Sequence, residues 1–198
     1  GEADAVQYLK GRFEAMGYNV TLQPYTDEQG RTGHNVIAVK EASAPNGDIL
    51  VLSAHHDSVP TAYGANDNAS GVAALLYIAE ALKDIDSDTE LRLISFTDEE
   101  NGKNGSRAYT ASLTDAEKAR MIGDIQLDML GGLGTDGTVV CTMDGQANWI
   151  SDLLEEKAAG LERRAETASD HVSFQLMGIP SVLLMQDSQG YLYHSAAD

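Results

Sequence analysis

The sequence predicts an α/β domain with three layers, in which helices cover both faces of a mixed, mostly parallel central sheet. Three observations lead to this prediction. Segments with strand-like patterns alternate with segments of helical spacing along the chain. Residues 49–54 are apolar on both faces, which is typical of a central strand covered by helices. Two alternating segments near the beginning predict an antiparallel hairpin at one edge of the sheet.

The first forty residues predict a helix followed by this hairpin. Gly17 follows a set of apolar residues at helical spacing and can end the helix. These apolar residues are Val6, Leu9, Phe13 and Met16. Apolar and polar residues then alternate over residues 18–22, and a turn-rich segment, 26–33, leads to a second strand at 35–39.

Strands and helices alternate over the rest of the chain. The strands are expected at residues 49–54, 90–97, 122–130, 138–142 and 180–185. A single apolar stripe predicts a helix from about residue 69 to residue 83. The spacing of Thr114 and Glu117 is that of a capping box. Further helices are expected at about 106–111 and 147–159, and one capped by Ser169 or Asp170.

The composition limits the classes of function. The chain has 198 residues, of which 42% are hydrophobic, enough for one domain with a sizeable core. Thirteen basic residues oppose 31 acidic ones, and the net charge of −18 argues against nucleic acid or an anionic membrane surface as a partner. No apolar run has the length of a membrane helix, so no membrane insertion is expected. Cys141 is the only cysteine, which excludes an intrachain disulfide and a thiolate cluster.

Histidines and carboxylates gather at the ends of the predicted strands, where α/β proteins place their chemistry. His55 directly follows the strand 49–54, and Asp57 comes two residues later, where a carboxylate can support a metal-bound imidazole. His55 and His56 would point to opposite faces of a continuing strand, so only one of them faces the site. Asp128 interrupts an apolar strand, and a buried carboxylate is costly unless it is paired or bound to metal.

Several of these residues also have a purely structural explanation. Asp67 can cap the following helix, Glu99 and Glu100 can form a solvated acidic turn, and His194 alone is most simply a surface residue. Taken as a set, these residues favour a metal-binding site. The carboxylates of Asp67, Glu100 and Asp128, with one bridging hydroxide, balance the charge of two divalent ions. Histidine and carboxylate ligands suit Zn²⁺, and less selectively Mn²⁺ or Co²⁺.

Six short motifs carry a resemblance to a known family. They are Ala-His-His-Asp-Ser (54–58), Gly-Ala-Asn-Asp-Asn-Ala-Ser-Gly (64–71), Asp-Glu-Glu-Asn-Gly-Lys-Asn-Gly-Ser (98–106), Leu-Asp-Met (127–129), Ser-Asp-His-Val-Ser-Phe (169–174) and Tyr-His-Ser (193–195). In order and spacing the chain resembles the secreted two-zinc aminopeptidases, which include bacterial leucyl aminopeptidase and, more distantly, glutamate carboxypeptidase. The resemblance implies a zinc-exopeptidase-like fold. It also implies hydrolysis of the N-terminal bond of peptides that have a free N-terminus.

The same resemblance implies the metal ligands. His55 and Asp128 would bind one Zn²⁺, and Glu100 and His194 would bind the other. Asp67 would bridge the two ions.

The resemblance further implies roles for three residues that are not ligands. Glu99 would be the general base and acid, acting on a water shared by the two ions. Asp57 would support His55, and Tyr193 resembles a residue that stabilises the oxyanion in some members. The walls of the substrate pocket are expected in the loops 131–136 and 185–191, and the sequence leaves the preferred N-terminal residue and the oligomeric state open.

Two other functions are compatible with this family likeness. A glutaminyl cyclase-like zinc acyltransferase usually works with one metal, and the full set of five ligands argues against it. A non-catalytic, peptidase-like binding domain would have lost ligands or the base. We expect one catalytic domain over residues 1–198, in the extracellular space or the cell envelope, and lacking the terminal helix into which the family usually continues after Asp198.

Overall fold

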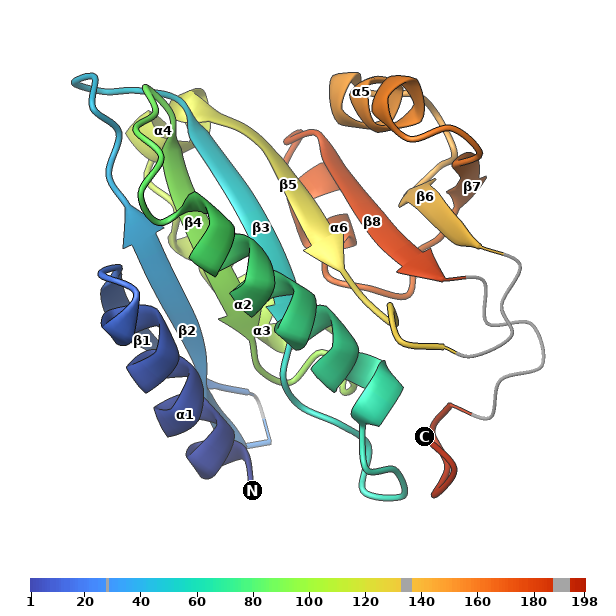
Figure 1. The fold of residues 1–198 in the computed structure, drawn as a ribbon. Helices are drawn as coiled ribbons and strands as arrows, with labels where there is room; N and C mark the ends of the chain where they lie inside the picture. Colours follow the sequence, from blue (N-terminus) through green and yellow to red (C-terminus); the bar gives the residue numbers. More distant parts are fainter. Residues whose placement is uncertain (28, 133–136, 187–192) are drawn as a thin grey trace.

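A mixed sheet forms the middle layer of the molecule, and helices cover both of its faces (Figure 1). The computed structural model describes residues 1–27, 29–132, 137–186 and 193–198. Within these residues the sheet has eight strands in the order β1-β2-β4-β3-β5-β8-β6-β7. Their bounds are β1 Asn19–Thr26, β2 Thr32–Lys40, β3 Ile49–His55, β4 Glu90–Phe96, β5 Met121–Leu127, β6 Thr138–Thr142, β7 Glu162–Ala165 and β8 Ser181–Gln186.

The pairing of the strands confirms the predicted mostly parallel centre. The four central strands, β4, β3, β5 and β8, are parallel to one another. β1 and β2 form the expected antiparallel hairpin, and β2 is also antiparallel to β4. On the other side, β6 is antiparallel to β8 and parallel to the edge strand β7. The sequence pattern did not predict β7, because its residues, Glu-Arg-Arg-Ala, are largely exposed and include three charges.

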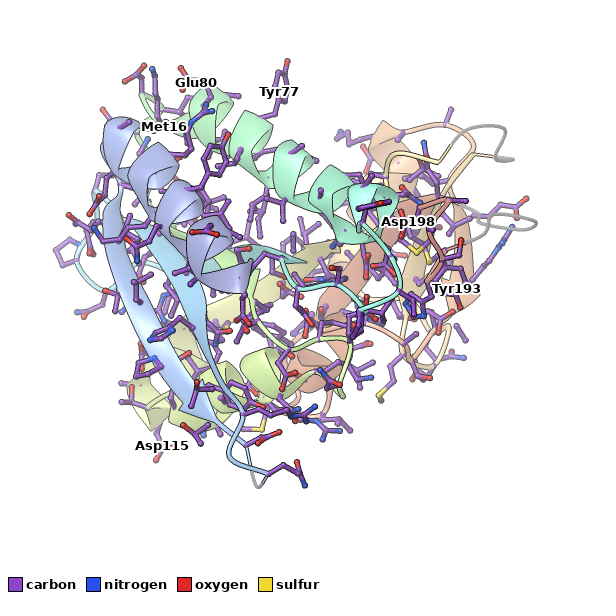
Figure 2. The ribbon with its side chains drawn as sticks, turned by 90° about the horizontal axis from the view of Figure 1, so that it is seen from below. Met16, Tyr77, Glu80, Asp115, Tyr193 and Asp198 are labelled. Carbon is purple, nitrogen blue, oxygen red and sulfur yellow. The ribbon has the colours of Figure 1, made fainter. Side chains whose placement is uncertain are left out.

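The helices pack on the sheet as two separate layers. Their bounds are α1 Glu2–Ala15, α2 Gly71–Leu82, α3 Asn104–Ser112, α4 Asp115–Arg120, α5 Trp149–Lys157 and α6 His171–Gln175, and a single π-type turn, η1, spans Ala65–Ser70. α1 and α2 lie on one face of the sheet, and α3 and α6 lie on the other (Figures 1 and 2). In β3, Leu52 and Ala54 pack towards α1 and α2, whereas Ile49 and Val51 pack with the opposite layer. Both faces of β3 are therefore buried, as its apolar sequence predicts.

Two boundaries differ from the prediction in ways that affect the site. The strand expected over residues 122–130 ends at Leu127, so Asp128 lies just beyond β5 and not within it. The helix expected soon after Asp67 begins only at Gly71. Asp67 belongs to η1, where its φ of −109° and ψ of 87° are not helical. Its side chain makes no capping bond at η1 or at α2, which leaves the carboxylate available for other contacts.

The predicted helix caps are confirmed in one place and corrected in another. Thr114 Oγ1 accepts a hydrogen bond from the backbone N–H of Glu117 (3.2 Å), and a Glu117 carboxylate oxygen accepts one from Thr114 N–H (2.9 Å), which is the expected capping box. Asp170 occupies the N-cap position of α6, but its side chain makes no capping bond. Ser169 does not cap this helix either, because its hydroxyl donates to Asp128 (2.8 Å). None of the described helices has both the length and the apolar character of a membrane span.

Candidate metal centre

Three neighbouring parallel strands end at one edge of the sheet, and most of the predicted site residues follow them directly. His55 is the last residue of β3, and Asp128 comes immediately after β5. Glu99 and Glu100 lie in the loop after β4, and Asp67 lies in η1, between β3 and α2. Because the carboxyl ends of parallel strands meet at the same edge, the fold brings these distant residues together.

The first group of close polar side chains contains His55, Asp67 and Asp128. The Nε2 atom of His55 lies 3.1 Å from Oδ1 of Asp67 and 3.4 Å from Oδ1 of Asp128. All three residues are buried. One ligand atom from each lies within 4.8 Å of the others, which is the spacing that residues around a single ion require.

The second group contains Glu100, His194 and, again, Asp67. The Nε2 atom of His194 lies 3.0 Å from Oε2 of Glu100 and 3.1 Å from Oδ2 of Asp67. Asp67 thus presents one oxygen to each group, Oδ1 to His55 and Oδ2 to His194. The structure therefore brings together all five residues that the resemblance implied as ligands.

The donor atoms fit a divalent metal ion. His55 Nε2, Asp128 Oδ1 and Glu100 Oε1 are buried and have no hydrogen-bond partner among the described residues. Leaving such atoms without a partner is costly, and a bound cation would satisfy them. The set consists of imidazole nitrogens and carboxylate oxygens, which is a donor set that zinc accepts.

The pKa values of these groups reflect an excess of negative charge at the site. Burial, and then the nearby carboxylate of Asp170, raise the pKa of Glu99 to about 9. Burial and the carboxylate of Asp67 raise the pKa of Glu100 to about 7. Burial lowers the pKa of His55, but the carboxylate of Asp128 and its neighbours outweigh this and hold that pKa well above its ordinary value. A cation at this place would offset the repulsion between the carboxylates.

Asp57 contacts His55, as predicted, and also contacts the paired glutamates. Its backbone oxygen lies 3.2 Å from His55 Nδ1, and its carboxylate lies 3.5 Å from the same nitrogen. The two carboxylate oxygens accept hydrogen bonds from the backbone N–H groups of Glu99 (3.0 Å) and Glu100 (3.2 Å). Asp57 therefore fixes the loop after β4 against the end of β3, which the sequence did not reveal.

His56 points away from the centre, as the alternation of the strand predicts. Its Nδ1 atom lies 3.0 Å from the hydroxyl oxygen of Ser95, and burial lowers its pKa to about 4. His55 is the histidine of this pair that lies with the carboxylates.

Two residues that the sequence left without a role hold the loop of Asp67. The side-chain amide of Asn68 donates to Leu127 O (2.9 Å) and accepts from the backbone N–H of Met129 (3.2 Å), so it bonds on both sides of Asp128. The carboxylate of Asp198 accepts hydrogen bonds from Asn66 N–H (2.8 Å) and Asp67 N–H (3.3 Å). No local pattern in the sequence links Asp198 to residues 66 and 67.

A buried polar network lies behind the candidate metal ligands. Ser169 donates to Asp128, and the amide of Gln126 lies 3.3 Å from Ser169 Oγ and 3.4 Å from the carboxylate of Asp170. Burial raises the pKa of Asp170 to about 7. The motif 169–174 contributed to the resemblance, but its position in the sequence did not show that it packs behind Asp128.

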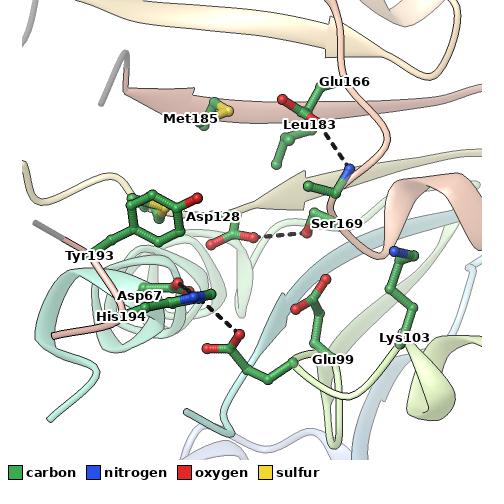
Figure 3. A pocket seen from close by; sticks show the side chains of 14 residues that line it. Asp67, Glu99, Lys103, Asp128, Glu166, Ser169, Leu183, Met185, Tyr193 and His194 are labelled. Atoms are coloured by element: carbon green, nitrogen blue, oxygen red, sulfur yellow. Dashed lines mark hydrogen bonds and ion pairs between the residues drawn. The ribbon is translucent and has the colours of Figure 1, made fainter. Parts of the chain in front are cut away.

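A cavity of about 440 Å³ opens onto both ligand groups (Figure 3). Its described lining includes Asp67, Glu99, Glu100, Asp128 and His194. Apolar side chains form another part of its wall, namely Met129, Leu183, Met185 and Tyr193. Of the loops expected to form the pocket walls, residues 133–136 and 187–191 lie outside the described residues, whereas Met185 does line the cavity.

Tyr193 lies at the mouth of this cavity, with 47% of its surface exposed. Its ring packs against the imidazole of His194, with ring centroids 4.5 Å apart. The predicted oxyanion residue is therefore beside a candidate metal ligand.

Comparison with known proteins finds curated relatives that are peptidases. The chain is 37% identical over 168 residues to aminopeptidase YwaD of Bacillus subtilis, an alignment that covers 81% of this chain and 36% of the relative. It is 35% identical over 188 residues to leupeptin-inactivating enzyme 1 of Streptomyces exfoliatus, with 91% of this chain and 42% of the relative covered. The chain thus spans about two fifths of the length of the curated relatives it matches.

Solved structures share the fold. An aminopeptidase from Aneurinibacillus sp. strain AM-1 superposes with a TM-score of 0.91 at 26% identity, covering 98% of this chain and 82% of that one. A zinc aminopeptidase from Bacillus subtilis superposes with a TM-score of 0.78 at 34% identity, covering 84% of this chain and 44% of that one. A glutaminyl cyclase from Bacteroides thetaiotaomicron, at 22% identity and a TM-score of 0.74 over 91% and 74% of the chains, shares the fold alone.

The family model described as peptidase family M28 matches residues 35–198, which include every candidate ligand. The predicted zinc peptidase family is thereby confirmed, and this chain belongs to peptidase family M28.

Proposed function

We propose that this chain carries the catalytic site of a zinc aminopeptidase, which removes the N-terminal residue from peptides. The observation that carries the proposal is the pair of ligand groups that share Asp67, with the carboxylate of Glu99 lining the same cavity. The names of the relatives and of the zinc-containing structural neighbour support the same reaction.

The proposed centre holds two zinc ions. His55 and Asp128 would hold one, Glu100 and His194 would hold the other, and Asp67 would bridge them. The two separate groups of close ligand atoms support this count. Manganese or cobalt would be accepted as substitutes, because the donors are nitrogen and oxygen without sulfur.

The chain's own residues have defined parts in the reaction. Zinc at this centre would polarise the scissile carbonyl and lower the pKa of a water molecule. Glu99 Oε1 is buried and has no hydrogen-bond partner among the described residues, which supports a role in which it would take a proton from that water and return it to the leaving amine. Asp57 holds the Glu99 backbone in position. The Tyr193 hydroxyl would donate to the developing oxyanion.

The apolar part of the cavity wall supports a preference for an apolar first residue. Met129, Leu183 and Met185 provide a surface on which a side chain such as leucine would lose its hydration. We therefore expect leucine to be cleaved faster than aspartate or lysine at the first position of otherwise identical peptides.

Hydrolysis of leucine p-nitroanilide by the purified chain tests the proposal. We expect hydrolysis that a chelator abolishes and that added zinc restores. The Glu99→Gln variant should lose at least a hundredfold in kcat while still binding zinc, because the amide cannot accept the proton. Equal cleavage of N-acetylated and free peptides would show that the protein is not an aminopeptidase, and full activity of Glu99→Gln would remove that residue's assigned role.

The alternative of a glutaminyl cyclase has one supporting observation, which is the shared fold with the Bacteroides cyclase. It requires ring closure of an N-terminal glutamine and about one zinc ion per chain. Formation of pyroglutamyl peptide without release of any amino acid would favour it over the aminopeptidase.

We also propose that the protein acts outside the cell or in the cell envelope. The resemblance to secreted aminopeptidases supports this location. Fractionation of the producing cells tests it, and protein found only in the cytosol would contradict it.

A further inference from the structure

Lys103 is a basic side chain in a cavity whose lining contains several acidic side chains. Five acidic residues are among the described lining residues: Asp67, Glu99, Glu100, Asp128 and Glu166. Within that described lining, Lys103 is the one lysine or arginine. No ion pair joins its ammonium group to any residue that the structure describes. The cavity therefore contains a positive charge that the protein's described carboxylates do not neutralise by direct contact.

The local structure does not favour a lysine at this position. Lys103 has φ 61° and ψ 36°, the left-handed conformation that residues with a Cβ atom adopt only at a cost. It is also the N-cap residue of α3, and a cation near a helix N-terminus is repelled by the helix dipole. Residues that break local rules in this way are expected where function requires them.

The same backbone turn joins Lys103 to the proposed general base. Lys103 N–H donates to the carbonyl oxygen of Glu99 (2.8 Å). In Figure 3 the Glu99 carboxylate lies between the Lys103 side chain on one side and His194 with Tyr193 on the other. Lys103 therefore marks the end of the cavity that lies beyond Glu99, away from the second ligand group.

With Glu99 in its proposed role, this position would correspond to the leaving part of the substrate. Glu99 must reach the nitrogen of the scissile bond in order to protonate it, so the leaving peptide continues past Glu99. The first residue of the substrate would then lie at the opposite end, against the apolar wall to which Met129, Met185 and Tyr193 contribute. A negative group on the leaving peptide would meet Lys103, whereas the other charged side chains of the described lining that are not histidine are all acidic.

We infer that Lys103 determines specificity by binding a carboxylate on the leaving part of the peptide. This assignment rests on the proposed aminopeptidase function. The carboxylate has two possible sources, the C-terminus of a very short peptide or the side chain of an aspartate or glutamate in the second position. The preferred substrates would accordingly be dipeptides or peptides with an acidic second residue.

Two matched pairs of substrates separate these sources. Leu-Gly is compared with Leu-Gly amide, and Leu-Asp amide is compared with Leu-Asn amide. For the zinc-loaded parent protein we expect kcat/KM to be about tenfold higher for the charged member of at least one pair. A lysine–carboxylate contact at a partly buried site stabilises a complex by about the free energy that corresponds to a tenfold change. Lys103→Met should bring this ratio close to one, and Lys103→Arg should keep most of it.

The Lys118→Met variant is the matched control. Lys118 lies in α4, is partly exposed like Lys103 and does not line the cavity, so its removal changes the net charge equally. Its charged-to-neutral ratio should equal that of the parent. If this ratio fell in Lys118→Met as far as in Lys103→Met, only the overall charge would matter and the inference would be overturned.

Binding measured without turnover separates this inference from the proposed function. Isothermal titration of the same four peptides into zinc-loaded Glu99→Gln protein, with and without Lys103→Met, gives the dissociation constants directly. Within the pair that shows a preference for charge, we expect Lys103→Met to raise the dissociation constant of the charged peptide about tenfold and that of the neutral peptide by less than twofold. Equal effects on both peptides, or no preference for a charged peptide in the parent, would overturn the role of Lys103. Failure of the parent to release leucine from any of the four peptides would instead refute the aminopeptidase proposal.

Discussion

At the scale of a single residue, the carboxylate of Asp57 connects the end of β3 with the loop that follows β4. It faces the Nδ1 side of His55 and accepts hydrogen bonds from the backbone N–H groups of Glu99 and Glu100. Partners of this kind orient metal ligands and commonly affect metal affinity nearly as much as the ligands do. The sequence predicted only the contact with His55, since spacing along one strand shows nothing about the loop that follows another strand.

We expect the Asp57→Asn variant to bind zinc about 10- to 100-fold more weakly than the parent. In the parent, Oδ1 of Asp57 accepts from Glu99 N–H and Oδ2 accepts from Glu100 N–H. In asparagine an NH₂ group replaces one of these oxygens, so a donor faces one of the two N–H groups and that hydrogen bond is lost. Competition with a chelating indicator measures the affinity. Asp86→Asn, an exposed residue in a loop, is the control, and equal zinc affinity in the two variants would contradict the role assigned to Asp57.

At the scale of the elements, Asn68 joins η1, β5 and α2. Its side-chain amide bonds to Leu127 O, Met129 N–H and Gly71 N–H, the last at 2.9 Å. The approach is so close that a Cβ atom at Gly71 would lie 2.3 Å from Leu127 O. Asp67 and Asp128, on adjacent loops, are held in one arrangement by this amide.

The Asn68→Ala variant should lower the free energy of unfolding by about 2–4 kcal/mol, because it leaves three buried backbone groups without their partner. It should also reduce the stabilisation that zinc provides, since Asp67 and Asp128 are no longer held together. Urea unfolding with and without zinc measures both effects. Asn19→Ala, exposed on β1, should change stability by no more than about 0.5 kcal/mol, and an equally small change in Asn68→Ala would contradict this account.

At the scale of the whole molecule, the sheet carries a buried acid below the site. Asp124 of β5 is fully buried between the hydroxyls of Ser53 (2.6 Å) and Ser181 (2.7 Å). Burial raises its pKa from 3.8 to about 7. The folded protein therefore binds a proton here that the unfolded chain releases at lower pH.

This shift has a definite sign for stability. Because the pKa is raised on folding, the stabilising contribution of Asp124 is complete below about pH 4 and is lost as the pH rises through about 7. In Asp124→Asn this dependence is absent, so the stability of the variant relative to the parent should rise between pH 5 and pH 8. Urea unfolding of both proteins with saturating zinc measures the difference, and a difference that is constant with pH would contradict the raised pKa.

Much of the fold follows from local sequence patterns, whereas the supporting contacts do not. The apolar run of β3 and the spacing of Thr114 and Glu117 predicted their structures, because strand burial and capping depend on neighbouring residues. β7 was missed because pairing with β6, and not its own residues, makes it a strand. Similarly, the candidate ligands were predicted as a set, but the hydrogen bonds of Asp198 to residues 66 and 67 join positions more than 130 residues apart.

The central claim is that one carboxylate, Asp67, joins two metal ions in this fold. Anomalous diffraction at the zinc absorption edge, from crystals of the zinc-loaded protein, tests it most directly. We predict two peaks, both bonded to Asp67, one also contacting His55 and Asp128 and the other also contacting Glu100 and His194. A single peak, or peaks that do not share Asp67, would contradict the two-zinc centre.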